Sequence, residues 1–206
     1  MTIFAIGDSH SIFFWNSEII KEHWVSFAGL PLTWYQLINR GLDLYNVGTK
    51  LGNDHEKYNI KSGDCVLFCY GWNDIQKNIY KYAKNNYKTE LESLINKYGE
   101  LLINYKNKYN ITPIVQNIMP NPLKESTSIN GDADTRNMYI KYANQYLFNY
   151  CKDNDILFFD VYDLVADEKG YLKNIYTKDK IHLDYDNMFL RKTIDNKLIN
   201  LVNQHN

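Results

Sequence analysis

One residue near the start of the chain and two near its end could together supply a nucleophile, a base and an orienting carboxylate. Ser9 follows an apolar run in the stretch IFAIGDSH, where a turn after a strand would expose its hydroxyl. Asp179 and His182 stand three residues apart in DKIH, so the carboxylate could orient the imidazole. A serine hydroxyl is a weak nucleophile until an imidazole removes its proton, and a carboxylate holds that imidazole in the productive tautomer. These residue types predict acyl-transfer chemistry.

Acyl transfer also requires donors that stabilise the negative charge of a tetrahedral intermediate. The candidates are the backbone N–H of Ser9, the glycine Gly29 at the end of an apolar run, and the side-chain amide of Asn73 in GWND. Asn73 has a plainer interpretation as the cap of the helix that follows, because asparagine is favoured at that position. The stretch DKIH could likewise be a solvated loop. The candidates gain weight together, because Ser9, Gly29 and Asn73 each follow a predicted strand.

Short apolar runs alternate with helical patterns along the chain. Strands are expected over 2–6, 24–29, 64–71, 112–119 and 156–162. Helices are expected over 11–22, 31–40, 89–109, 136–152 and 186–202. The alternation predicts βαβ units, and hence an α/β fold with a mainly parallel five-stranded sheet that helices cover on both faces. Ligands bind at the carboxyl ends of the strands in such sheets, so the candidate residues are expected at one edge.

The bulk composition fits one soluble domain over residues 1–206. Apolar residues make up 45% of the chain and charged residues 23%, and the formal net charge is −1. This charge gives no basic bias, so no nucleic-acid partner is expected. No segment reaches the roughly 18 apolar residues of a membrane helix, so no membrane partner is expected either. The three cysteines have neither CxxC nor zinc-ligand spacing, which favours buried free thiols, a cytoplasmic setting and no metal or other cofactor. The oligomeric state stays open.

Three short blocks resemble the GDS, GxND and DxxH motifs of the SGNH/GDSL hydrolases: GDS at 7–9, GWND at 71–74 and DKIH at 179–182. The resemblance implies a flavodoxin-like three-layer α/β/α sandwich and a serine esterase mechanism. It implies that Ser9 is the nucleophile and also donates its N–H to the oxyanion, with the Asn73 amide as a further donor. Asp179 and His182 would complete the triad. His10 stands where the family usually has leucine, which marks a GDSH sub-type.

The family's remaining oxyanion donor is a glycine N–H after the second strand. Gly29 in SFAGLPLTW fits, because it ends a predicted strand and opens a helix. Gly48 in YNVGTKLG is the alternative, and it lies nearer in sequence to GWND. We favour Gly29.

Neighbouring polar residues have structural interpretations. His10 could be mistaken for the base, but adjacent side chains usually point apart, so we expect it to form a wall or at most to contact substrate. Asp8 is expected to fix the turn through backbone N–H groups. Asp74 is expected to cap a helix or brace a loop.

Two other functions remain open. A metal-dependent phosphoesterase would recruit the acidic and histidine side chains near both ends of the chain: Asp8, His10, Asp179, His182 and Asp184. A non-catalytic carbohydrate- or partner-binding module could also keep this fold.

The substrate of an esterase here is expected to be a small or glycan ester. The segment 119–135 should overhang the active edge, and it is polar and poor in long apolar clusters. Trp72 and Trp34 could offer flat faces to a sugar ring. The sequence therefore predicts short acyl esters, with acetyl favoured, on a carbohydrate.

Overall fold

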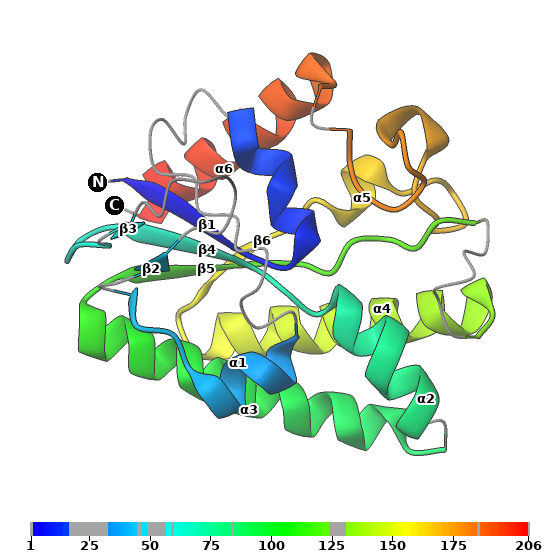
Figure 1. The fold of residues 1–206 in the computed structure, drawn as a ribbon, viewed down its shortest axis with the longest axis horizontal. Helices are drawn as coiled ribbons and strands as arrows, with labels where there is room; N and C mark the ends of the chain where they lie inside the picture. Colours follow the sequence, from blue (N-terminus) through cyan, green and yellow to red (C-terminus); the bar gives the residue numbers. More distant parts are fainter. Residues whose placement is uncertain are drawn as a thin grey trace.

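A parallel four-stranded sheet forms the centre of the molecule in a computed structural model of the chain (Figure 1). The structure describes residues 2–16, 33–44, 47–48, 57–58, 60–83, 85–123, 131–184 and 186–205. The sheet has the order β1-β4-β5-β6, with β1 at Ile3–Gly7, β4 at Cys65–Cys69, β5 at Thr112–Gln116 and β6 at Leu157–Phe159. All three pairings are parallel. β1 and β4 are buried along their whole length, as continuous apolar runs in a parallel sheet should be.

Helices cover both faces of this sheet. On one side lie α1 (Trp34–Arg40), α3 (Tyr87–Tyr109) and α4 (Ala133–Asp153), and on the other lie η1 (Ser9–Asn16) and α6 (Met188–His205) (Figure 1). α3 buries the apolar positions that recur every three or four residues in its sequence. The three-layer α/β/α arrangement predicted from the sequence is therefore confirmed.

The sheet holds four strands in the described part of the chain, whereas the sequence predicts five. The predicted strand over 24–29 lies outside the described residues. A separate pair, β2 (Val47–Gly48) and β3 (Lys57–Tyr58), runs antiparallel. The first helix, predicted over 11–22, is a 3₁₀-helix over Ser9–Asn16, and the later part of the predicted range lies outside the described residues.

Short elements connect the sheet to its helices. They are the π-helix η3 (Asp74–Ile79), α2 (Tyr80–Tyr82), α5 (Tyr162–Val165) and the 3₁₀-turn η4 (Asn174–Tyr176). Local sequence patterns do not predict η3, because π-helices are rare and carry no apolar period of their own. Among the described residues, no helix is both long and apolar enough to cross a membrane.

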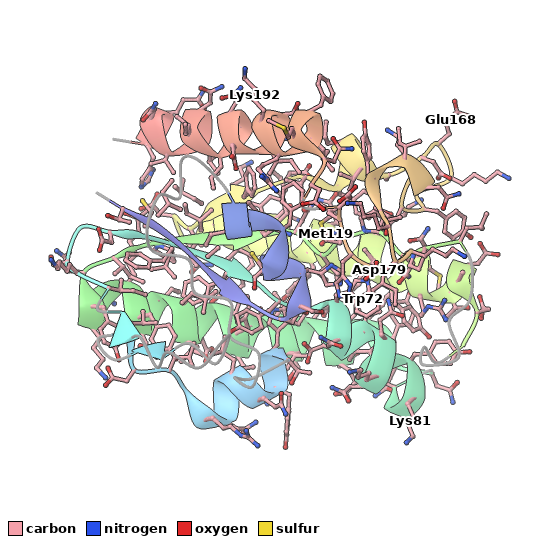
Figure 2. The ribbon with its side chains drawn as sticks, turned by 45° about the horizontal axis from the view of Figure 1, so that its top comes forward. Trp72, Lys81, Met119, Glu168, Asp179 and Lys192 are labelled. Carbon is pink, nitrogen blue, oxygen red and sulfur yellow. The ribbon has the colours of Figure 1, made fainter. Side chains whose placement is uncertain are left out.

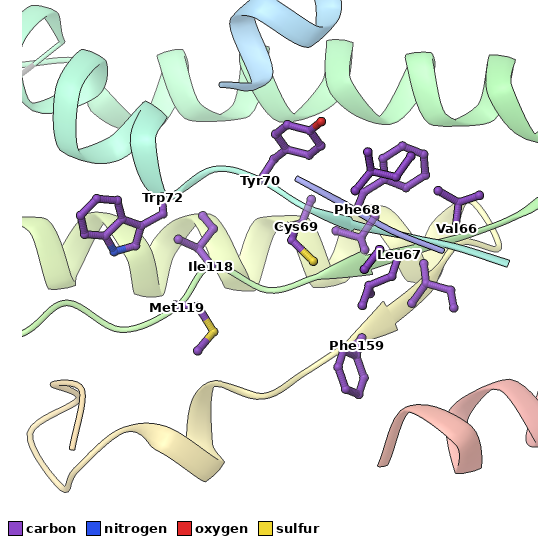
Figure 3. Close-up of a cluster of buried hydrophobic side chains, with 14 of the residues drawn as sticks. Val66, Leu67, Phe68, Cys69, Tyr70, Trp72, Ile118, Met119 and Phe159 are labelled. Atoms are coloured by element: carbon purple, nitrogen blue, oxygen red, sulfur yellow. The ribbon is translucent and has the colours of Figure 1, made fainter. Parts of the chain in front are cut away.

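The core fills the space between the sheet and the helices. Phe68 of β4 points to the side of α3, where its ring stacks on Tyr105 at 6.3 Å (Figure 3). Phe159 at the end of β6 lies on the side of α6 (Figure 3). Cys65, Cys69 and Cys151 are buried and form no disulfide, as expected from their spacing. The core thus holds the strands rigidly, so that the residues after them keep fixed positions.

Candidate active site

Ser9 stands where the chain leaves the sheet after β1. A Cβ atom on Gly7 would lie 2.2 Å from the carbonyl oxygen of Cys69, so only glycine allows the two strands to approach so closely. The N–H of Asp8 donates to the same carbonyl at 3.0 Å and ends the strand pairing. The chain then turns into η1 with Ser9 as its first residue. The hydroxyl of Ser9 is therefore placed at the carboxyl edge of the sheet.

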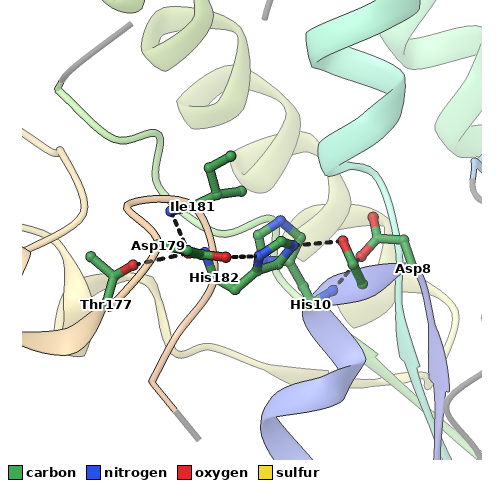
Figure 4. A network of polar contacts seen from close by, with 7 residues as sticks. Asp8, His10, Thr177, Asp179, Ile181 and His182 are labelled. Carbon is green, nitrogen blue, oxygen red and sulfur yellow. Dashed lines mark hydrogen bonds and ion pairs between the residues drawn. The ribbon is translucent and has the colours of Figure 1, made fainter. Parts of the chain in front are cut away.

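The structure brings Ser9, His182 and Asp179 together, although 173 residues separate the first two. Nε2 of His182 lies 2.8 Å from the hydroxyl oxygen of Ser9. Nδ1 of His182 lies 2.5 Å from Oδ2 of Asp179. Figure 4 shows the imidazole of His182 beside the carboxylate of Asp179, and the two contacts place that imidazole between the carboxylate and the Ser9 hydroxyl. This arrangement lets the imidazole exchange a proton with Ser9 while Asp179 fixes its tautomer.

The loop that carries the imidazole is organised by Asp179 itself. Its Oδ1 atom accepts the backbone N–H groups of Ile181 at 2.8 Å and His182 at 2.7 Å. The hydroxyl of Thr177 donates to the same oxygen at 3.3 Å. A bridge between Thr177 and Leu183 closes the loop. The spacing of three residues in DKIH is therefore what allows one carboxylate to hold both the loop and the imidazole.

Asp179 remains ionised over the pH range in which proteins are ordinarily assayed. Partial burial on its own would raise the pKa of Asp179, but hydrogen bonds from the His182 side chain and from the backbone of His182 and Ile181 lower that pKa to about 2. The carboxylate can therefore stabilise a positive charge that develops on the imidazole.

Asn73 is tied through Asp8 to the turn that carries Ser9. Its side-chain Nδ2 donates to Oδ2 of Asp8 at 3.2 Å, and the backbone N–H of His10 donates to Oδ1 of Asp8 at 2.9 Å. The side chain of Asn73 forms no helix cap, which removes the plainer interpretation of this residue. Burial raises the pKa of Asp8 to about 6 against the opposing effect of these donors. The sequence predicts the turn role of Asp8 but not its bond to Asn73, because 65 residues separate them.

Two further donors were expected at this site. The N–H of Ser9 donates to no acceptor in the described part of the chain, so it is available to an oxyanion. Gly29, the favoured glycine donor, lies outside the described residues. Gly48, the alternative, lies in β2 of the separate two-stranded sheet. Which glycine completes the donor set stays a prediction.

Asp74 braces α1, as its sequence position suggests. Its carboxylate accepts the backbone N–H groups of Trp34 at 2.7 Å and Tyr35 at 3.4 Å, at the start of that helix. Asp74 is fully buried, and this burial raises its pKa to about 7. An acidic side chain at a helix N-terminus satisfies donors that have no partner inside the helix.

The unfolding free energy is expected to fall as the pH rises from about 4 to about 7. The pKa of Asp74 is raised from 3.8 to about 7, so the folded chain holds a proton that the unfolded chain has already released in this window. Asp74→Asn removes this titration and should flatten the slope. The raised pKa of Asp8, about 6, and the lowered pKa of His10, about 3, then contribute with opposite signs. Urea unfolding of wild type and variant at a series of pH values measures how the unfolding free energy depends on pH. Parallel slopes in wild type and variant would contradict the assignment.

The two tryptophans expected to face a sugar ring are buried instead. Trp34 is 0% exposed and Trp72 is 7% exposed. The ring of Trp72 packs on His10, with 4.9 Å between the ring centroids. His10 also lies against His182, at 5.0 Å between centroids. The prediction that these tryptophans offer open faces to a carbohydrate is therefore wrong, because both rings are packed in the protein interior.

An open cavity of about 310 Å³ borders the histidine–aspartate pair. It lies between η1 and the loop 178–184, and it is lined by His10, Phe13, Lys178, Asp179, His182, Leu183 and Asp184. A larger cavity of about 580 Å³ reaches Asp74 between α1 and α3 but touches none of Ser9, Asp179 and His182. Figure 2 shows Trp72, Met119 and Asp179 grouped in one region of the molecule, away from Lys192. The site is therefore located by its polar geometry rather than by cavity size.

The arrangement differs from that of a metal centre. In the ranges that the structure describes, no three His, Cys, Asp or Glu side chains gather as metal ligands would. Asp8 accepts hydrogen bonds from Asn73 and from the His10 backbone, and Asp179 is bonded to His182. Three of the side chains that a phosphoesterase would need, Asp8, Asp179 and His182, are therefore directed to other partners.

Comparisons with solved structures identify the fold. A GDSL-like lipase from Bacteroides thetaiotaomicron matches 100% of this chain and 89% of its own, with a TM-score of 0.63 and 19% identity. This chain has the SGNH/GDSL hydrolase fold. A Bacteroides fragilis protein named as an acylhydrolase matches 99% of this chain and 87% of its own, with a TM-score of 0.66 and 18% identity. An acetyl xylan esterase, AlAXEase, matches 98% of this chain and 100% of its own, with a TM-score of 0.57 and 16% identity.

The SGNH/GDSL hydrolase fold accounts for the positions of the three sequence blocks. GDS begins at the last residue of β1 and GWND follows β4, so both lie at the carboxyl end of the sheet. DKIH precedes α6 and reaches the same end through the contact of His182 with Ser9. Neither a protein-family model nor a curated protein sequence matches this chain. The fold therefore comes from structural likeness, and the chemistry has to be inferred from the site.

Proposed function

We propose that this protein is a serine esterase that cleaves short acyl esters through a Ser9–His182–Asp179 triad. The observation that carries the proposal is the continuous chain of contacts from Asp179 through the imidazole to the Ser9 hydroxyl, at 2.5 Å and 2.8 Å. The named hydrolases that share the fold support the same class of reaction. The acyl group is proposed to be acetyl and the alcohol a carbohydrate.

In the first half of the reaction, the Ser9 oxygen bonds to the acyl carbon and its proton passes to Nε2 of His182. The Ser9 N–H and the Asn73 amide stabilise the resulting oxyanion, with a glycine N–H as the expected third donor. The bond from the acyl carbon to the alcohol oxygen then breaks, and His182 gives its proton to that oxygen. Asp179 stabilises the imidazolium throughout.

In the second half, a water molecule attacks the acyl-enzyme and gives a proton to His182. The bond between the Ser9 oxygen and the acyl carbon breaks, and the proton returns to Ser9. The products are a carboxylic acid and the free serine. No other co-reactant is required.

Two features support the finer substrate proposal. The polar segment 119–135 begins after β5, and its composition offers few apolar side chains against which a long acyl chain could pack. One protein with this fold is an acetyl xylan esterase, whose name joins an acetyl group to a glycan. The buried tryptophans no longer support the carbohydrate, so the alcohol has to be tested separately from the acyl group.

Hydrolysis of a matched panel of esters is expected to favour acetyl over long acyl groups. The panel consists of p-nitrophenyl acetate, butyrate and octanoate, followed by acetylated xylan oligosaccharides and simple alkyl acetates. We expect kcat/KM to fall at least about tenfold from acetate to octanoate, a difference of about 1.4 kcal/mol in transition-state binding, and acetylated sugars to exceed alkyl acetates. Faster cleavage of octanoate would refute the short acyl group, and faster cleavage of alkyl acetates would refute the carbohydrate.

Asn73→Ala is expected to lower kcat by about 10²–10³-fold, the usual effect of removing one oxyanion donor. The amide carries two N–H donors, of which Asp8 accepts one, so the other can reach the oxyanion. Steady-state kinetics with p-nitrophenyl acetate measure the loss. Asn78→Ala, in η3 a few residues further on, is the matched control and should keep kcat within about threefold of wild type. An unchanged kcat in Asn73→Ala would remove this residue from the donor set.

A further inference from the structure

The imidazole of His10 lies inside a stack of rings beneath the proposed base. Its ring centroid is 4.9 Å from that of Trp72 and 5.0 Å from that of His182, with interplanar angles of 53° and 46°. The side chain is 6% exposed, although its sequence neighbour Ser9 reaches the surface of the site. Figure 4 shows the His10 ring beside His182 rather than pointing away from it. His10 lines the cavity beside the site, which agrees with the expected wall role, and its ring also packs directly on the proposed base.

The stability of the fold gives no reason for a histidine at this position. Both ring nitrogens of His10 are buried and lack a hydrogen-bond partner within the described residues. Buried polar atoms are nearly always bonded, and leaving one without a partner costs about 1–3 kcal/mol. An apolar side chain of similar size would avoid that cost. An explanation is therefore more readily found in the neighbouring site than in the core.

The imidazole of His182 needs support on its ring face. Hydrogen bonds at Nδ1 and Nε2 fix the two ends of the ring but leave it free to tilt about the line that joins them. The side chain is 34% exposed, and the cavity of about 310 Å³ opens beside it. His10 and Phe13 lie one turn apart in the 3₁₀-helix η1, and both line this cavity. His10 therefore supplies packing at a place where solvent and cavity would leave the base loose.

We infer that His10 is a positioning residue that fixes the tilt of His182 by packing a neutral ring against it. The inference rests on the proposed function, because it gives His182 the role of base. A tilt of the imidazole moves Nε2 relative to the Ser9 hydroxyl, and a displacement near 1 Å can cost about 10²-fold in rate. The role is one of geometry, so a flat apolar ring should be able to fulfil it.

The charge state of His10 suits this role. Burial, and then the charge on His182, lower the pKa of His10 to about 3, so the ring is neutral at working pH. The titratable groups around it are His182 and Asp179, with Lys178 and Asp184 at the rim of the cavity. Lys178 pairs with Asp186 at 2.6 Å and with Asp184 at 3.1 Å, so its positive charge is held by these carboxylates. A neutral His10 does not repel the imidazolium that forms on His182 during the reaction.

Two variants separate the ring from its nitrogens. His10→Ala removes the support and should lower kcat for p-nitrophenyl acetate by about 10–100-fold, with KM within about twofold of wild type. His10→Phe keeps a flat ring and should recover kcat to within about threefold. His10→Ala should also slow the rate at which a fluorophosphonate labels Ser9, whereas His10→Phe should retain that rate. Leu198→Ala, a core truncation in the middle of α6, is the control that loses thermal stability without losing kcat in the folded protein.

The outcomes separate this inference from the proposed function. A folded His10→Ala variant with wild-type kcat and labelling rate would overturn the positioning role while leaving the esterase intact. A His10→Phe variant as slow as His10→Ala would also overturn it, because the nitrogens rather than the ring would then be required. Failure of the wild-type protein to react with the fluorophosphonate would overturn the proposed function itself, and this inference with it.

Discussion

Replacing Ser9 by alanine is expected to lower kcat by about five to six orders of magnitude, close to the loss when the nucleophile of a serine protease is removed. The hydroxyl of Ser9 is the group that His182 contacts at 2.8 Å, and no other side chain bonds to Nε2 of His182 in the described part of the chain. The substitution removes one oxygen atom at a turn that is held by Gly7 and Asp8, so the fold should be unaffected. Steady-state kinetics and circular dichroism measure the two effects separately.

The control for this prediction is Ser93→Ala on α3, an exposed serine far along the chain from the site. This variant should retain wild-type kcat, because it also removes a serine hydroxyl but at a position on α3 that does not contact His182. Activity in Ser9→Ala that purification to homogeneity does not remove would contradict the serine mechanism. If the protein is a non-catalytic binding module, Ser9→Ala and Ser93→Ala should not differ, because the wild type would have no esterase activity to lose.

Asp179→Asn is expected to lower kcat by about 10⁴-fold, the loss seen when the carboxylate of a serine protease triad is replaced in this way. The asparagine oxygen can still accept the backbone N–H groups of Ile181 and His182, so the loop keeps its shape. The amide nitrogen then faces Nδ1 of His182 in place of Oδ2 and donates to it. The imidazole is left with its proton on Nε2, where it cannot accept the proton of Ser9.

The matched control for this substitution is Asp184→Asn in the same segment. Asp184 pairs with Lys178 at 3.1 Å and accepts the N–H of Asp186, and it contacts neither nitrogen of the imidazole. It should keep kcat within about threefold, because a partly exposed ion pair contributes only about 0–1 kcal/mol. A kcat for Asp179→Asn within about tenfold of wild type would show that another group orients His182. Proton NMR of the imidazole would reveal the change of tautomer directly.

The elements with a strong local pattern were predictable from the sequence. β4 is a continuous apolar run, and α3 carries apolar residues at spacings of three and four. The pairing of Asp179 with His182 was predictable as well, because both residues lie in one short loop. The connection of that loop to Ser9 followed only from the βαβ order, which brings strand ends to one edge.

Contacts between distant segments escaped the local patterns. The bond between Asp8 and Asn73 spans 65 residues, and neither residue type reveals it. Trp72 is buried against His10, and Trp34 is buried against Tyr98. These contacts join distant segments, so the sequence alone could not show which aromatic residues lie at the surface and which in the interior. The π-helix η3 has no sequence period by which to recognise it. Tertiary packing, rather than propensity, determines each of these features.

The central claim is that Ser9 is a nucleophile activated by His182 and Asp179. Intact-protein mass spectrometry after reaction with a fluorophosphonate, followed by peptide mapping, tests it without knowledge of the natural substrate. We predict one adduct per chain on Ser9 in the wild type, a rate at least about 10³-fold lower in Asp179→Asn, and no adduct in Ser9→Ala. An unmodified wild-type chain, or an adduct that maps to any residue other than Ser9, would contradict the claim.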